Sequence, residues 1–100
     1  MRIIAKRTLR QFWERSRRYA DAKRALEDWH AQVQKADWTT PAAVKAMYGD
    51  ASILKGRRVV FNICGNKYRL ITKINFPYRV VYIRFVGTHE EYDKVDAETV

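Results

Sequence analysis

The fold is decided by residues 59–74, which read VVFNICGNKYRLITKI. Two runs of β-branched and aromatic residues flank Gly65-Asn66, and a two-residue Gly-Asn link between such runs is a specific signal for a β-hairpin. With that link as the loop, Asn62 lies opposite Arg69 and Arg58 lies opposite Lys73. Side chains alternate across a strand, so the hairpin has an apolar face and a cationic face. The apolar face carries Val59, Phe61, Ile63, Tyr68, Leu70 and Thr72, and the cationic face carries Arg58, Asn62, Lys67, Arg69 and Lys73.

The charge distribution around this hairpin indicates a polyanionic partner. Residues 51–88 contain no Asp or Glu but eight Lys and Arg. The whole chain has 20 Lys and Arg against 11 Asp and Glu, a formal net charge of +9. Holding charges of one sign on a rigid sheet is unfavourable, and nucleic-acid backbone is the usual compensation. We therefore expect the cationic face to bind nucleic acid.

Length and composition predict one folded domain over residues 1–100. A chain of 100 residues with 47% apolar and 13% aromatic residues is large enough for one core and is not typical of disorder. The first residues lack the apolar stretch of a signal peptide, and no apolar run approaches the roughly 20 residues that cross a bilayer. We therefore expect a cytoplasmic protein without a membrane partner. The single cysteine, Cys64, excludes an internal disulfide.

The first half of the chain has helical periodicity. Residues 2–5 form a short strand candidate, and the capping box Thr8-x-x-Gln11 predicts the start of a first helix. Thr40-Pro41 predicts the start of a short third helix that ends near Tyr48. Between them, apolar residues recur at steps of three and four and predict a second helix: Tyr19, Ala22, Leu26, Trp29 and Val33.

A third strand, residues 80–86, follows a turn at residues 75–78. A loop of two or four residues there places Arg69 opposite Arg84. Two arginines whose Cβ atoms stand about 5 Å apart repel each other unless an anion lies between them. The pairing therefore predicts a phosphate-binding position on the cationic face.

A short helix is predicted at the end of the chain. Thr88-x-x-Glu91 is a second capping box, and Gly87 before it permits a sharp change from strand to helix. His89 and Tyr92 then share one face of the first turn. The helix dipole and the nearby arginines disfavour a protonated imidazole, so we expect His89 to act as a proton acceptor. Together these elements predict an α+β fold: an N-terminal strand, two main helices and a short third helix packed on an antiparallel sheet, with a short C-terminal helix.

These groups suit RNA cleavage by attack of the ribose 2′-hydroxyl on the adjacent phosphate. That reaction needs a base, an acid and positive charge around the transition state. We assign Arg69 and Arg84 to the phosphate, His89 to proton transfer, and Tyr92 to base stacking or hydrogen bonding, and we leave open which group is the acid. The basic half has no Asp/Glu cluster for Mg²⁺, so we expect no metal and no cofactor. Further RNA contacts are expected from Lys55, Arg57, Arg58, Lys67 and Lys73.

Residues 59–70 and 81–94, with Ala36-Asp37-Trp38 and Thr40-Pro41, resemble the signature of the HigB toxins of the RelE/ParE-like superfamily. The resemblance implies a RelE-like fold and the toxin of a type II toxin–antitoxin pair. It implies an mRNA endoribonuclease that acts on translating ribosomes and inhibits translation. A helix-turn-helix antitoxin of the HigA type would neutralise it, including in higher-order complexes. The active-site residues of the family would correspond to Arg69, Arg84, His89 and Tyr92.

Other interpretations stay open at this point. A ParE-like gyrase poison would share the fold without enzymatic activity, and a basic RNA-binding module would bind RNA with a steep salt dependence and no toxicity. His89 would then be a helix-start residue bonded to backbone, and Tyr92 a core aromatic that anchors the last helix.

Overall fold

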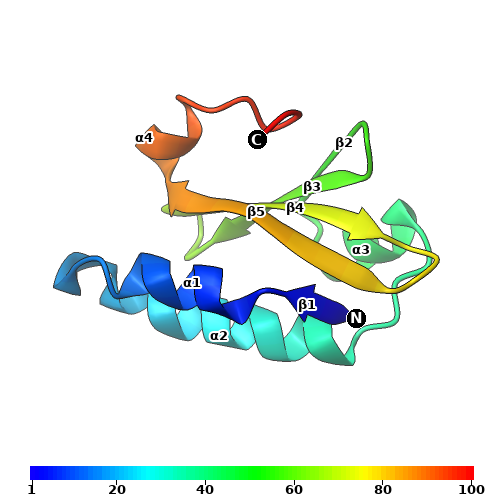
Figure 1. Ribbon diagram of the computed structural model, residues 1–100, viewed down its shortest axis with the longest axis horizontal. Coiled ribbons are helices and arrows are strands. Elements are labelled where there is room, and N and C mark those ends of the chain that lie inside the picture. Colours follow the sequence, from blue (N-terminus) through cyan, green and yellow to red (C-terminus); the bar gives the residue numbers. More distant parts are fainter.

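The protein is a five-stranded mixed sheet covered by helices, as Figure 1 shows for the computed structural model, which describes residues 1–100. Its elements are β1 (Arg2–Ile4), α1 (Lys6–Trp13), a 3₁₀ turn η1 (Arg17–Tyr19), α2 (Ala20–Lys35), α3 (Pro41–Met47), β2 (Ser52–Leu54), β3 (Arg58–Ile63), β4 (Tyr68–Asn75), β5 (Val80–Thr88) and α4 (His89–Tyr92). The strand order is β1-β5-β4-β3-β2, in which β1 runs parallel to β5 and the other neighbours are antiparallel. The predicted α+β fold is confirmed, with β2 as a strand that the sequence pattern did not indicate.

The sheet has two different faces. In Figure 1 the helices α1 and α2 lie along one face, which we call the inner face, and α4 and the last residues of the chain lie over the other, the outer face. The apolar side of the β3–β4 hairpin points to the inner face, since Val59, Phe61 and Leu70 belong to the main hydrophobic core. The cationic side, with Arg58, Arg69 and Lys73, therefore points to the outer face. The prediction for Lys67 is wrong, because this residue lies in the hairpin turn and pairs with Asp21 of α2. None of the helices combines the length and hydrophobicity needed to cross a bilayer.

The hairpin between β3 and β4 has the predicted register at every pair, from Arg58 opposite Lys73 to Ile63 opposite Tyr68. The turn is closed by a hydrogen bond of 3.2 Å from the Lys67 N–H to the Cys64 carbonyl. Cys64 adopts a positive φ of 54°, beside Gly65 at 66°. A non-glycine residue in this left-handed region is uncommon, and the residue pattern does not reveal it.

The predicted pairing between β4 and β5 is wrong. Arg69 lies opposite Gly87, not opposite Arg84. Asn75 pairs with Val80, so the centre of the connecting turn lies one residue later in the chain than expected. This difference shifts the register of the two strands by two residues. A β-bulge adds one more residue: Ile71 pairs with Phe85 and Thr72 with Ile83, so that Arg84 has no partner on β4.

The predicted start of the first helix is also wrong. α1 begins at Lys6, its N-cap is Ala5 without a side-chain cap, and Thr8 lies inside the first turn. The pairing of β1 with β5 ends at Ile4, so the chain enters the helix directly and tertiary structure overrides the local capping signal. The caps predicted at Thr40 and Thr88 are confirmed, because both hydroxyls accept a hydrogen bond from the backbone three residues later.

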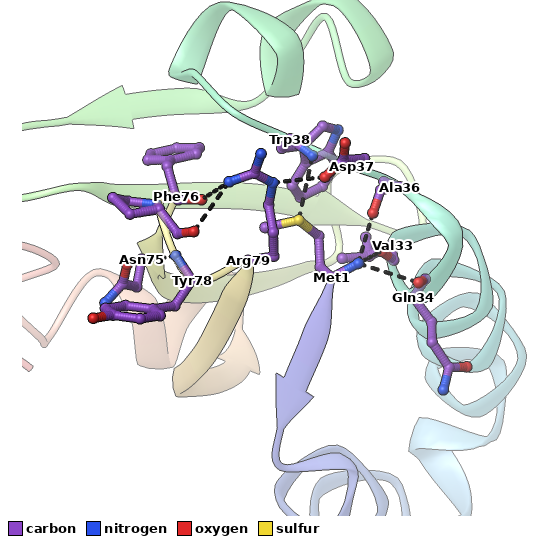
Figure 2. A network of polar contacts seen from close by, with 11 residues as sticks. Met1, Val33, Gln34, Ala36, Asp37, Trp38, Asn75, Phe76, Tyr78 and Arg79 are labelled. Atoms are coloured by element: carbon purple, nitrogen blue, oxygen red, sulfur yellow. Dashed lines mark hydrogen bonds and ion pairs between the residues drawn. The ribbon is translucent and has the colours of Figure 1, made fainter.

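The N-terminal residue fastens β1 to the end of α2, as Figure 2 shows. The Met1 amino group donates to the carbonyls of Val33, Gln34 and Ala36 at 3.3, 3.1 and 2.6 Å. Its thioether accepts the Trp38 N–H at 3.3 Å. The Gln34 carbonyl lies in the last turn of α2, where carbonyls lack a partner within the helix, so the Met1 amino group satisfies it.

The turn between β4 and β5 is fixed to the same region. Arg79 Nε donates to Asp37 Oδ1 at 2.6 Å, and its Nη1 donates to the carbonyls of Phe76 and Pro77 (Figure 2). This turn sets the register of β5. The contact between Arg79 and Asp37 therefore helps to determine where every later residue of β5 lies.

Phe61 lies at the centre of the aromatic part of the core. Its ring is 1% exposed and lies 5.3 Å from Trp29, 6.1 Å from Trp38 and 5.2 Å from Tyr48 between ring centroids. The buried positions of α2 predicted from periodicity are also confirmed, except for Tyr19, which lies in η1.

We expect Phe61→Ala to lower the free energy of unfolding by about 3 to 5 kcal/mol, because it removes a large buried ring and leaves a cavity. Equilibrium unfolding in urea measures this change. Tyr78→Ala is the control, since this ring is 79% exposed and its loss should cost less than about 0.5 kcal/mol. Equal losses for the two variants would contradict this description of the core.

Candidate active site

Arg69 and Tyr92 meet on the outer face, beside the turn that joins β3 to β4. The Arg69 guanidinium carbon lies 5.7 Å from the centre of the Tyr92 ring, within the range of a cation–π contact. Arg69 also donates through Nη1 to the Asn66 carbonyl at 3.1 Å and through Nη2 to the Asn66 side chain. The guanidinium is therefore held between the hairpin turn and α4 before any ligand binds.

His89 lies on the same short helix and lines an open groove. The groove has a volume of about 460 Å³ and is lined by Arg18, Tyr19, Lys67, Thr88, His89, Glu90, Glu91 and Lys94. The His89 N–H donates to the Lys67 carbonyl at 3.1 Å, which fixes the start of α4 against the hairpin. Its Nδ1 lies 3.3 Å from Asp93 Oδ2, and the side chain is 47% exposed. Nε2 is thus the ring nitrogen that has no protein partner.

Arg84 is not next to Arg69. It lies on β5 three residues before Gly87, the residue opposite Arg69, which corresponds to about 10 Å along the strand. Its side chain reaches the outer face, because it lines a groove with Arg57, Lys73, Ile74, Asn75 and Tyr82. The two predicted phosphate-binding arginines share a face of the sheet, but the expected pocket between them is absent.

The other cations predicted to bind RNA differ in accessibility. Arg57 and Lys73 line the groove beside Arg84. Lys55 lies 3.4 Å from Glu98, and Lys67 pairs with Asp21. Arg58 departs from the expectation of an open surface: it is 8% exposed and donates to the backbone oxygens of Ala97 and Val100.

Asp21 is a site neighbour that the sequence analysis missed. Its carboxylate accepts from Lys67 and from the Tyr68 hydroxyl, the latter at 2.6 Å. The hydrogen bond from Lys67, followed by that from Tyr68, lowers the pKa of Asp21. Burial and the Asp21 carboxylate raise the pKa of Tyr68. No local signal indicates this contact, since more than 40 residues separate the partners.

Arg15 is the second residue that was missed. Its Nη2 lies 2.9 Å from Glu91 Oε2, and its guanidinium lies 5.1 Å from the Phe12 ring centre and 5.3 Å from that of Tyr19. Glu91 Oε1 also accepts the Thr88 N–H at 2.9 Å, so the capping box is complete. Arg15 therefore fastens α4, with His89 and Tyr92, to the end of α1.

Gly87 has a different role from the expected one. Its φ is not positive, and β5 continues through it to Thr88. A Cβ at this position would lie 2.7 Å from Cζ of Phe85 and 3.0 Å from Oε1 of Glu91. The glycine thus leaves room for two neighbouring side chains. No group of three or more His, Cys, Asp or Glu side chains is placed to hold a metal ion.

Residues 22–95 match the HigB toxin family, described as the RelE-like toxic component of a toxin–antitoxin system. This chain belongs to the HigB toxin family. It is 29% identical over 97 residues to the mRNA interferase HigB of Escherichia coli O6:H1, with 95% of this chain and 91% of that protein covered. It is 30% identical over 95 residues to the mRNA interferase toxin HigB of Escherichia coli K12 and to the mRNA interferase HigB of Shigella flexneri, with 93% of this chain and 88% of each relative covered.

The ion pair between Arg15 and Glu91 makes the attachment of α4 in this HigB-family chain dependent on pH. The Arg15 hydrogen bond, followed by the Thr88 backbone, lowers the pKa of Glu91. A lowered pKa in the folded state stabilises the protein above the ordinary glutamate value, near pH 4.3, and this contribution is lost as the pH falls through the folded value.

We expect Glu91→Gln to be less stable than the wild type at pH 7 by up to about 1 kcal/mol, since the pair is partly exposed and screened by solvent. The difference should shrink toward pH 3. Urea unfolding at both pH values measures it. Glu90→Gln, on the same helix without an ion pair, is the control and should leave the free energy of unfolding nearly unchanged. A Glu91→Gln deficit that is equal at both pH values would exclude the ion pair as its cause.

Proposed function

We propose that this HigB-family toxin is an mRNA endoribonuclease whose reacting phosphate binds beside Arg69, His89 and Tyr92. The observation that carries the proposal is the contact between Arg69 and Tyr92, with His89 on the same turn of α4. The names of the relatives support RNA as the substrate, because they are mRNA interferases. The excess of Lys and Arg on the outer face supports a polyanion at this surface.

The chemistry follows from these groups. The ribose 2′-oxygen attacks the phosphorus, the bond from phosphorus to the 5′-oxygen breaks, and a 2′,3′-cyclic phosphate and a 5′-hydroxyl form. One proton leaves the 2′-oxygen and one is delivered to the 5′-oxygen. Arg69 neutralises charge that grows on the non-bridging oxygens. His89 Nε2 and the Tyr92 hydroxyl are the two groups available for the two proton transfers.

The partners follow from the same proposal. Arg84, Arg57 and Lys73 contact neighbouring phosphates of the RNA, and Lys55 and Lys67 add positive charge at its edges. The basic helices bind ribosomal RNA when the toxin acts on translating ribosomes in the cytoplasm. A helix-turn-helix antitoxin neutralises the toxin, as the family description supports for the antitoxin in general.

We expect Arg69→Ala to reduce RNA cleavage by a factor of about 10² or more, because one group that stabilises transition-state charge is lost. Mapping of transcript 5′ ends after induction measures cleavage in cells. Arg2→Ala, which removes an exposed arginine from β1, is the matched control and should retain activity.

Urea unfolding of Arg69→Ala shows whether the fold is kept. A folded Arg69→Ala variant with unchanged cleavage would remove Arg69 from the mechanism. Double-strand DNA breaks with intact mRNA after induction of the wild type would instead support a gyrase poison.

A further inference from the structure

Two arginines of the outer face converge on one oxygen atom. A main-chain carboxyl oxygen of Val100 accepts from Arg58 Nη1 and from Arg84 Nε, the latter at 3.3 Å. Arg58 Nη1 also donates to the Ala97 oxygen at 3.2 Å. An oxygen that receives donors from two guanidinium groups is bound as a phosphate oxygen is bound. The pair Arg58 and Arg84 therefore has the geometry of an anion site that part of the chain now fills.

The segment that fills it, residues 93–100, is ordered by its own hydrogen bonds. Asp96 Oδ1 accepts the Glu98 N–H at 2.9 Å, and the Asp96 carbonyl accepts the Val100 N–H at 2.9 Å. These bonds turn the chain so that the Val100 oxygen reaches the arginines. Glu98 adds an ion pair with Lys55 at 3.4 Å.

The sheet beneath this segment provides an apolar surface. Val60 and Ile71 face each other across β3 and β4 and are 3% and 0% exposed, yet they do not belong to the main core under the helices. Val95, Ala97 and Val100 are half-buried. Figure 1 shows the end of the chain passing over this face of the sheet. The segment is therefore docked by apolar contact and by the two arginines together.

We propose that segment 93–100 occupies a subsite for RNA phosphate formed by Arg58 and Arg84, so that the docked segment and bound RNA exclude one another. The inference rests on the proposed function, because it assigns RNA to this face. Arg58 is nearly inaccessible while the segment is docked, although it lies on the face with the greatest excess of positive charge. Asp93, Asp96 and Glu98 bring the negative charge that residues 51–88 lack.

The charges around the Arg58–Arg84 pair favour displacement by RNA, because a strand of RNA brings several phosphates. In the docked state Arg58 donates to the uncharged carbonyl of Ala97, and both arginines donate to a Val100 oxygen, beside two cations that have no anionic partner, Arg57 and Lys73. A phosphate carries a full negative charge and strengthens each hydrogen bond from a guanidinium. The surplus of positive charge thus favours exchange of the segment for an RNA strand.

The test measures binding separately from cleavage. The probe is a fluorescent RNA oligonucleotide that carries 2′-O-methyl groups at every ribose, so that 2′-hydroxyl attack is blocked, and anisotropy gives its Kd. Asp96→Ala removes the side-chain bond that shapes the segment. Asp28→Ala is the matched control, since it removes one exposed carboxylate without an ion pair from α2 on the other side of the sheet.

We expect Asp96→Ala to bind the oligonucleotide about threefold or more tightly than Asp28→Ala, the change that loss of one net hydrogen bond produces in a docking equilibrium. The gain should disappear in an Arg84→Ala background, because the shared site is then incomplete. In the wild type, the oligonucleotide should speed hydrogen exchange of the amides of Glu98, Thr99 and Val100.

Several results would overturn the inference. These are equal affinities of Asp96→Ala and Asp28→Ala, an Asp96→Ala gain that persists without Arg84, and amides of residues 98–100 that stay protected in the presence of saturating oligonucleotide. Wild-type protein that fails to bind the oligonucleotide would overturn it as well. A wild type that binds with these properties but never cleaves unmodified RNA would refute the proposed enzyme and leave the phosphate subsite in place.

Discussion

The pairing of β4 with β5 is the constraint on which the outer face depends. It extends from Tyr68 opposite Thr88 to Asn75 opposite Val80, through the middle of the sheet. This register places the start of α4 beside Lys67, and therefore brings Tyr92 to Arg69. A slip by one residue would turn each side chain of β5 to the opposite face and separate these groups.

The outer face has a second cationic centre around Arg84. Side chains alternate along β5, so Arg84 joins Lys73 and Tyr82 on the outer face, while Ile83 keeps its contact with the core. The bulge at Arg84 changes the pairing of the residues that follow it, so that Phe85 lies opposite Ile71. Bulges commonly redirect a side chain near functional sites. The face therefore has two separate groups, one around Arg69 and α4 and one around Arg84, suited to successive positions along a strand of RNA.

Prediction from sequence succeeded where the signal is local. The Gly65-Asn66 link fixed the β3–β4 register, and the caps at Thr40 and Thr88 fixed two helix starts. Prediction failed where contacts between residues far apart in the sequence determine the local structure. The position of the β4–β5 turn depends on the contact of Arg79 with Asp37, and nothing in residues 75–80 shows that contact. A bulge likewise has no signature in a run of β-branched residues.

The same limit applies to the candidate site. His89 and Tyr92 were located from the capping box, because its two ends are three residues apart. The partners that hold this helix, Arg15 and the Lys67 carbonyl, come from other elements. The carboxylates that neutralise cations of residues 51–88 also come from outside that stretch: Asp21 for Lys67, Asp37 for Arg79 and Glu98 for Lys55.

A helix of four residues is too short to be stable alone, so the position of α4 is determined by its contacts. Glu91 bonds to Arg15 and to the helix start, and Tyr92 lies against Arg69. Arg69 is thus both a support of α4 and the group proposed to hold the phosphate. A phosphate that draws the guanidinium toward itself must also change the contact with Tyr92. In the proposed mechanism, binding of RNA and placement of His89 and Tyr92 are therefore coupled through a single side chain.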